Sequence, residues 1–150
     1  MAELTWSDKS AIGVEAIDEE HKELFEAMGE LESAVTRNAG AEETGALLGK
    51  LAATTGKHFA DEEALMREAK YSGIAMHTAN HQRLMEKINA FVARLNRNGA
   101  EMNQHDLNFL RDWLVYHIEN DDRRLGDWLK DRVRDLARAA QQKQALERSA

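Results

Sequence analysis

The chain contains no cysteine and no proline among its 150 residues. The absence of cysteine excludes disulfide bonds, zinc–thiolate sites, iron–sulfur clusters and cysteine nucleophiles. The absence of proline removes the residue that most strongly interrupts a helix interior, so long unbroken helices are permitted. Any metal chemistry in this chain must therefore use ligands other than thiolates.

An excess of basic residues and a long apolar run are also missing. The chain has 27 acidic and 20 basic residues and a formal charge of −7, which argues against a general binder of nucleic acids or anionic membranes. No apolar stretch approaches the ~20 residues of a membrane span, and the first residues lack the basic and apolar regions of a signal peptide. We therefore expect a cytoplasmic protein that binds neither nucleic acid nor membrane.

Apolar residues recur at spacings of three and four, which is typical of amphipathic helices, and no strand-like alternation is present. We expect a first helix capped by Asp18, then helices over about 42–70, 74–97 and 103–120, with Gly40, Gly73 and Gly99 closing the first three. The expected inner face of the second helix comprises Leu47, Leu51, Thr55, His58, Glu62, Leu65 and Ala69. Short connections make neighbouring helices antiparallel.

The predicted fold is therefore all-α, an up-down-up-down antiparallel four-helix bundle with an N-terminal arm and a C-terminal helical extension. At 150 residues the chain fits one domain with a substantial core. We expect residues 1–130 to form the bundle and residues 131–150 to form a helical tail. That tail is either a solvated segment or a docking element for a partner.

Five of the six histidines fall on the predicted core faces together with carboxylates, whereas His105 lies in a polar segment and is expected to be exposed. A single buried histidine is usually a hydrogen-bonded core residue. Residues four apart on a helix have Cβ atoms about 5–6 Å apart, however, and can share a metal. A buried glutamate is costly unless it is paired or bound to a metal. A metal site inside the bundle is therefore favoured, with candidate ligands His21, His58, Glu62, His77, His81, His117 and either Asp121 or Asp122.

The number and type of these ligands narrow the choice of metal. Seven nitrogen and oxygen ligands exceed what one tetrahedral zinc ion can use, and imidazole suits zinc, copper, iron and nickel. Two carboxylates that can bridge indicate two metal ions. The Glu-x-x-His motif of ferritin-like di-iron proteins is absent, because no histidine here has a glutamate three residues before it.

The last carboxylate ligand is ambiguous. On a straight α-helix the i+4 position from His117 is Asp121, and Asp122 lies about 140° away from that face. Helix geometry alone therefore favours Asp121. A local widening or ending of the helix near residues 118–121 would favour Asp122 instead.

Residues 17–25, residues 58–63, the His77 and His81 pair, and residues 113–122 resemble the motifs of hemerythrins, in particular the bacterial single-domain hemerythrins. The resemblance covers roughly residues 6–128. It implies a non-haem di-iron centre in which His77, His81 and His117 hold one iron and His21 and His58 the other. Glu62 and Asp122 would bridge the irons together with an oxo or hydroxo group, so the family's spacing selects Asp122.

The resemblance further implies reversible dioxygen binding at a vacancy on the iron with two histidines, for oxygen storage, delivery or sensing. The implied pocket residues are Leu24, Phe25, Phe59, Leu114 and Ile118. The chain departs from the family at Ser72, where a proline is frequent, and at Leu125, where a tyrosine is frequent.

We therefore expect an oxygen-binding protein and not an enzyme. Its expected partners are dioxygen and either an oxygen-consuming enzyme or a signalling partner. Two alternatives stay open at this point, an iron-dependent oxidase or peroxidase and a sensor that signals through the tail.

Overall fold

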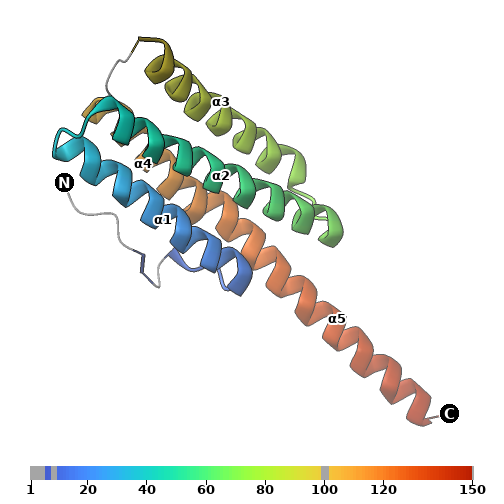
Figure 1. Ribbon diagram of the computed structural model, residues 1–150. Coiled ribbons are helices and arrows are strands. Elements are labelled where there is room, and N and C mark those ends of the chain that lie inside the picture. Colours follow the sequence, from blue (N-terminus) through green and yellow to red (C-terminus); the bar gives the residue numbers. More distant parts are fainter. Residues whose placement is uncertain (1–5, 8–9, 99–101, 150) are drawn as a thin grey trace.

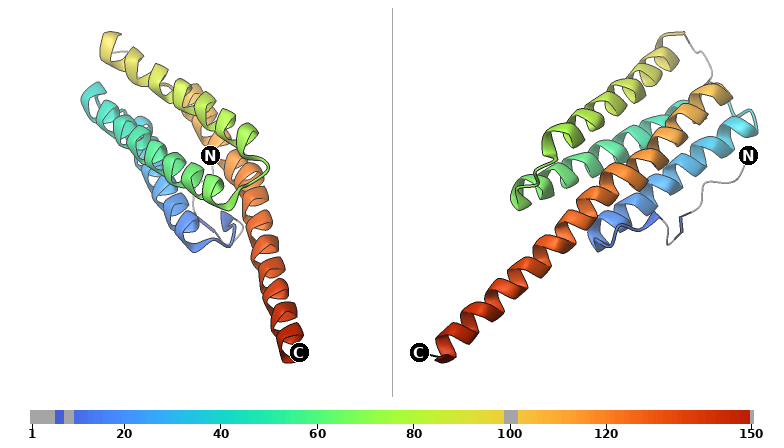
Figure 2. Two further views of the ribbon diagram at one scale, coloured as in Figure 1. Left: turned by 90° about the vertical axis from the view of Figure 1, so that its right-hand side faces the viewer. Right: turned by 180° about the vertical axis from the view of Figure 1, so that it is seen from behind.

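The computed structural model describes residues 6–7, 10–98 and 102–149, and these ranges contain helices and no strand. The helices are α1 (Glu15–Thr36), α2 (Ala41–Ala69), α3 (Ile74–Asn98), α4 (Gln104–His117), the π-helical segment η2 (Ile118–Asp122) and α5 (Arg123–Ser149). Helices α1 to α4 lie side by side in a four-helix bundle (Figures 1 and 2). The predicted all-α bundle is confirmed.

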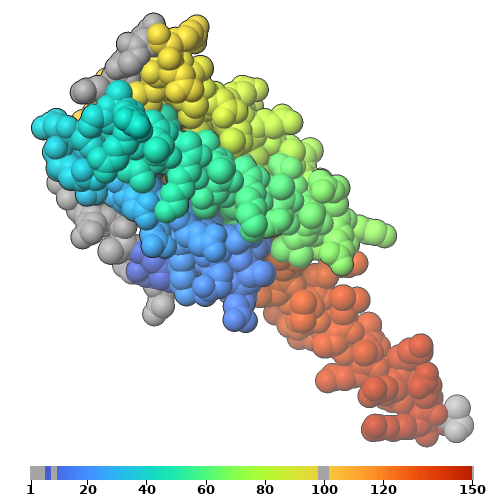
Figure 3. Space-filling model, viewed as in Figure 1, coloured from blue at the N-terminus to red at the C-terminus, as the bar shows by residue number. Residues whose placement is uncertain are grey.

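The fourth helix of the bundle continues without a break through η2 into α5, and α5 extends well beyond the ends of its neighbours (Figure 3). Every residue from 131 to 149 is exposed, including Val133, Leu136 and Leu146. The expected helical extension is therefore present. None of the helices in the described ranges combines the length and the apolar character that a membrane span requires.

The N-cap of the first helix lies four residues earlier than expected, so the prediction that Asp18 caps it is wrong. The N-cap of α1 is Val14, which provides no side-chain cap. Asp18 lies in the first turn, and its two carboxylate oxygens accept hydrogen bonds from the backbone N–H groups of Ile12 (2.8 Å) and Gly13 (3.1 Å). Asp18 thus fixes the N-terminal arm against the helix, and its negative charge is favourable near a helix N-terminus.

The glycines do not end the helices in the way that their positions suggested. Asn38 and Lys70 adopt the left-handed conformation, with φ of 55° and 57°, at the ends of α1 and α2. Asparagine tolerates this region through local hydrogen bonding. Gly40 is instead the N-cap of α2, and Gly99 lies outside the described residues.

The main core follows the bundle axis. The expected inner face of α2 needs three corrections, because Ala69 is only half-buried and two leucines were each expected to be buried in place of another residue. Leu48 and Met66 are fully buried, whereas Leu47 and Leu65 are half-buried at the edges of the core. The two leucine predictions were each wrong by one residue, which is about 100° around a helix. Because α2 also directs His58 and Glu62 inward, its buried face follows these polar residues as well as the leucines.

A second apolar cluster closes the end of the bundle near the start of α1 and contains Ile12, Ile17, Met66 and Leu125. It joins the N-terminal arm to α5 across Gly126, where an added Cβ would lie 2.6 Å from the backbone oxygen of Ile12. The contact therefore requires glycine at position 126. Leu125, where the resembled family often has tyrosine, is fully buried in this cluster.

Candidate metal centre

The seven predicted ligands converge from all four helices on one buried region. His21 comes from α1, His58 and Glu62 come from α2, His77 and His81 come from α3, His117 comes from α4, and Asp122 is the last residue of η2. None of them is more than 3% exposed. His105, in contrast, is exposed, as expected.

These side chains form two groups that share both carboxylates. In one group, Glu62, His77, His81, His117 and Asp122 each offer a ligand atom within 4.8 Å of the others. In the other group, the same holds for His21, His58, Glu62 and Asp122. The structure thus contains two adjacent positions that could each hold a metal ion.

Glu62 directs one oxygen to each group. Its Oε1 lies 2.5 Å from Nε2 of His77 and 3.1 Å from Nε2 of His81. Its Oε2 lies 3.3 Å from Nε2 of His58. A carboxylate with this orientation can bridge two metal ions.

Asp122 has the same orientation from the opposite side. Its Oδ1 lies 2.9 Å from Nε2 of His77 and 3.0 Å from Nε2 of His117. Its Oδ2 lies 2.8 Å from Nε2 of His21. The two carboxylates together divide the five histidines into a group of three and a group of two.

Most of the buried donor atoms lie close to one another without forming hydrogen bonds, the exception being Nε2 of His81 and Nε2 of His117 at 3.1 Å. Among the described residues, all four carboxylate oxygens of Glu62 and Asp122, both ring nitrogens of His21 and His58, and Nε2 of His77 are buried without a hydrogen-bond partner. An unsatisfied buried polar atom costs about 1–3 kcal/mol. Donors that converge on two shared positions are the expected arrangement for metal ligands, so this donor set fits a pair of metal ions.

The π-helical segment places Asp122 in the cluster and Asp121 outside it. In a π-helix the hydrogen bonds run from i to i+5, so the residue five positions after His117 comes onto its face. Asp122 is fully buried and points to the cluster. Asp121 instead lies behind the ring of His117, with Oδ2 2.9 Å from Nδ1. The straight-helix preference for Asp121 is therefore wrong, and the expected local widening is present.

The histidines and carboxylates shift one another's pKa values. Burial lowers the pKa of His58, but its interaction with the nearby carboxylates of Glu20 and Glu62 outweighs burial and raises the pKa to about 10. Burial also lowers the pKa values of His77 and His117. The nearby carboxylates of Glu62 and Asp122 outweigh burial and raise both pKa values to about 9. For Glu62, burial and Asp122 raise the pKa, but the histidines outweigh both and lower it to about 2. In the absence of metal, the positive charge of the protonated histidines thus balances the negative charge of the two carboxylates.

The five predicted pocket residues, Leu24, Phe25, Phe59, Leu114 and Ile118, are all buried in the main apolar cluster. Phe59 stacks on His81 with a centroid distance of 3.7 Å, and its ring lies 5.8 Å from that of His58. Trp113 stacks on His117 with a centroid distance of 4.6 Å. Apolar rings therefore surround the histidines on the side of the bundle core.

Three acidic residues near the cluster were not predicted as outer partners of the ligands, although Asp121 was considered as a ligand itself. Glu63 and Asp121 lie beside Nδ1 of His81 and His117 at 3.1 and 2.9 Å, and Glu20 lies 3.6 Å from Nδ1 of His58. Each directly precedes or follows a predicted ligand in the sequence. This adjacency was the signal available in the sequence. An acidic residue on a solvent-exposed helix face would give the same pattern, so the sequence alone does not identify these residues.

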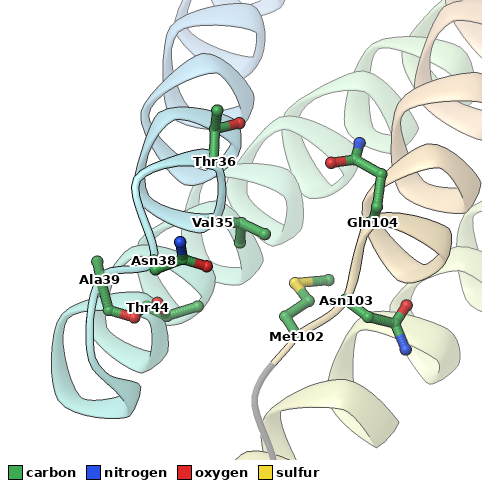
Figure 4. Close-up of a pocket in the computed structure, with 8 residues that line it drawn as sticks. All are labelled: Val35, Thr36, Asn38, Ala39, Thr44, Met102, Asn103 and Gln104. Carbon is green, nitrogen blue, oxygen red and sulfur yellow. Dashed lines mark hydrogen bonds between the residues drawn. The ribbon is translucent and has the colours of Figure 1, made fainter.

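A separate hollow of about 460 Å³ lies between the α1–α2 connection and the start of α4 (Figure 4). Its lining includes Val35, Asn38, Thr44 and Gln104. The hollow lies where α1 ends, α2 begins and α4 begins, whereas His21 and His117 lie toward the opposite ends of α1 and α4. The hollow is therefore remote from the metal cluster.

Comparison with known proteins agrees with this geometry. Residues 12–129 match the family described as "Hemerythrin HHE cation binding domain". The chain is 31% identical over 141 residues to a bacteriohemerythrin of Stenotrophomonas maltophilia, covering 94% of this chain and 91% of that protein. It is 32% identical over 117 residues to the myohemerythrin of Sipunculus nudus, covering 78% of this chain and 86% of that protein.

The fold of this chain also matches solved structures. A wild-type hemerythrin crystal structure superposes with a TM-score of 0.77 at 32% identity and covers 84% of this chain and 97% of that chain. The family match spans most of the sequence, and the two curated relatives and the solved structure exceed 30% identity over most of both chains. The chain belongs to the hemerythrin family.

Proposed function

We propose that this hemerythrin binds dioxygen reversibly at a di-iron centre, for oxygen storage, delivery or sensing. Oxygen binding at a di-iron site is the function of the family to which the chain belongs. The observation that carries the proposal for this chain is the orientation of Glu62 and Asp122. Each directs one oxygen to the three-histidine group and the other to the two-histidine group.

The proposed ligands of one iron are His77, His81 and His117, and those of the other are His21 and His58. Glu62 and Asp122 would supply the carboxylate oxygens for both irons. The bridging carboxylates contribute equally to both sides, so the two-histidine side has one protein ligand fewer, and we assign oxygen binding to that side. When bound, the iron pair supplies the two-electron redox chemistry that reversible oxygen binding requires.

The apolar residues around the histidines exclude water from this region. We propose that Leu24, Phe25, Phe59, Leu114 and Ile118 form the oxygen pocket, because all five are buried in one cluster with Phe59 against the histidine rings. Their side chains offer no acid or base to a bound molecule. This supports binding in preference to oxidase or peroxidase catalysis.

We further propose that residues 1–130 form the oxygen-binding unit and residues 131–150 a separate tail. A sensing role through that tail is the second candidate function. It is favoured by the exposure of Val133, Leu136 and Leu146 on a helix that extends beyond the bundle. A signalling protein would then be the partner, whereas a storage or delivery role implies an oxygen-consuming enzyme.

The experiment that tests this proposal is an oxygen titration of the ferrous protein. Anaerobic loading with Fe²⁺ is followed by stepwise addition of oxygen, with iron and oxygen uptake measured per chain. A binding protein takes up a fixed amount of oxygen for each iron pair and then stops. Continued oxygen consumption in the presence of a reductant, well above the rate of autoxidation, would favour the enzyme alternative.

A further inference from the structure

Asp121 lies outside the proposed ligand set but contacts one of its members directly. Its Oδ2 is 2.9 Å from Nδ1 of His117, the ring nitrogen on the opposite side from the cluster. An ionised aspartate can only accept hydrogen bonds. The Nδ1 of His117 must therefore carry a proton in this contact, and Nε2 is the ring nitrogen that faces the cluster, 3.0 Å from Oδ1 of Asp122.

Two further side chains hold Asp121 in place. The Nδ2 group of Asn80, on α3, donates a hydrogen bond of 3.0 Å to Oδ2 of Asp121. Arg124, one helical turn further along the chain, places Nη1 3.9 Å from Oδ1. The carboxylate is thus fixed between α3 and the beginning of α5, and its position does not depend on His117 alone.

The two histidine groups differ in the carboxylate partners of their Nδ1 atoms. In the three-histidine group, His117 has Asp121 and His81 has Glu63 (3.1 Å) as carboxylate partners at Nδ1. In the two-histidine group, Nδ1 of His58 is 3.6 Å from Glu20, beyond hydrogen-bond distance, and Nδ1 of His21 has no partner among the described residues. Carboxylate support is therefore concentrated on one side of the centre.

We propose that Asp121 is a positioning residue of the metal centre, which fixes the tautomer and ring orientation of His117 and increases the donor strength of its Nε2. The π-helical segment makes this division possible, because it places two consecutive aspartates on opposite sides of one imidazole. Outer partners of metal-bound histidines act in this way, and losing one typically costs 10–100-fold in metal affinity. The inference rests on the proposed function, since it requires a metal at the three-histidine group.

The test uses Co²⁺ alone as the probe and the full-length metal-free protein. Affinity is measured by competition with a chelator, and the visible Co²⁺ spectrum reports the ligand field of the bound ion. The variants are Asp121→Ala, Asp121→Asn and Asn80→Ala, and Glu119→Gln is the matched control because Glu119 is an exposed acidic residue of the same π-helical segment. Circular dichroism checks the fold of each variant.

We expect Asp121→Ala to weaken Co²⁺ binding about 10–100-fold and to shift the Co²⁺ spectrum. Asp121→Asn keeps an acceptor oxygen but loses the charge, so it should lie between Asp121→Ala and the wild type. Asn80→Ala should have a smaller effect in the same direction, and Glu119→Gln none. If Asp121→Ala does not fold, the spectrum and affinity of Asp121→Asn decide the question.

Unchanged affinity and spectrum in the folded Asp121 variants would overturn the inference. It would also be overturned if Asn80→Ala and Asp121→Ala weakened binding equally without a spectral shift, because the role of Asp121 would then be to join α3 to η2. If the wild-type protein itself does not bind Co²⁺, the proposed metal centre fails and this inference fails with it. The two failures are thus distinguishable.

Discussion

Asp122 and His21 lie 2.8 Å apart, from Oδ2 to Nε2, although they come from opposite ends of the bundle sequence and both are fully buried. The contact joins the end of the π-helical segment to α1. Because the other oxygen of Asp122 faces His77 and His117, this one side chain connects both histidine groups. The assignment of Asp122 as a bridge can be tested separately from that of its neighbour.

We expect Asp122→Ala to lose most of the bound iron, because it removes a shared ligand and leaves His21, His77 and His117 without their common carboxylate. Iron content per chain after anaerobic loading and desalting measures this. Asp121→Asn is the control and should retain the iron pair with lower affinity. Full iron content in Asp122→Ala together with loss of iron in Asp121→Asn would reverse the two assignments.

The stability of the metal-free protein should depend on pH through the histidine cluster. The folded pKa values of His58, His77 and His117 are raised to about 10, 9 and 9, above the value of about 6.5 for an unfolded histidine. Their stabilising contribution is therefore fully present below about pH 6.5 and is lost as the pH rises toward 9–10. The carboxylates act in the opposite direction, since the lowered pKa of Glu62, about 2, stabilises the fold above about pH 4.

Thermal unfolding of the metal-free protein, followed by circular dichroism between pH 5 and 9, measures this dependence. We expect the unfolding temperature to be highest near pH 5–6.5 and to fall toward pH 9. His58→Gln should flatten the profile, whereas His105→Gln, at the exposed histidine, should leave it unchanged. An unfolding temperature that rises from pH 6.5 to 9 would contradict the prediction.

The sequence predicts the existence of the helices and the inward positions of five histidines well, because both follow from a strong 3.6-residue periodicity. The sequence predicts less accurately where the answer depends on a difference of one position along the chain. Leu48 and Leu47 differ by a single position, and both are apolar, so the periodicity alone does not select the buried one. The end of α1 depends on the left-handed conformation of Asn38, which a neighbouring glycine obscured in the sequence.

The choice between Asp121 and Asp122 was difficult for a different reason. A π-helical segment adds one residue to a turn, and no sequence signal near Ile118 marks it. A straight helix therefore predicts Asp121, and only the spacing of the resembled family selects Asp122. Glu63 and Asp121 were missed as outer partners because an acidic residue beside a ligand is indistinguishable, in sequence, from a solvated one.

Gly126 should be intolerant of a side chain. An added Cβ would lie 2.6 Å from the backbone oxygen of Ile12, so Gly126→Ala must displace the N-terminal arm from α5. Overpacking of this kind costs about 1–3 kcal/mol. We expect a lower free energy of unfolding and, because the cluster around Ile12 and Leu125 closes this end of the bundle, faster autoxidation of the iron-loaded protein.

Gly29→Ala is the matched control, since an added Cβ there meets no atom within 4 Å and alanine favours a helix by about 1 kcal/mol over glycine. Denaturant unfolding of both variants gives the free energies. Equal stability of Gly126→Ala and the wild type would show that the arm does not close this end of the bundle tightly.

Removing residues 131–150 should leave the oxygen-binding unit intact. Every described residue of this segment is exposed, whereas Lys130 still packs its side chain over Gly13. We expect a chain that ends at Lys130 to unfold at nearly the same temperature as the full chain and to bind the same amount of iron. A large loss of stability or of iron would place the domain boundary elsewhere.

The most direct test of the central claim is the visible spectrum of the iron-loaded protein through one cycle of oxygenation. The ferrous protein is prepared without oxygen, exposed to oxygen, and then flushed with argon. The account predicts a charge-transfer band that appears with oxygen, disappears under argon and returns with oxygen, and that is absent in Asp122→Ala. A band that forms once and never reverses would contradict reversible oxygen binding at this centre.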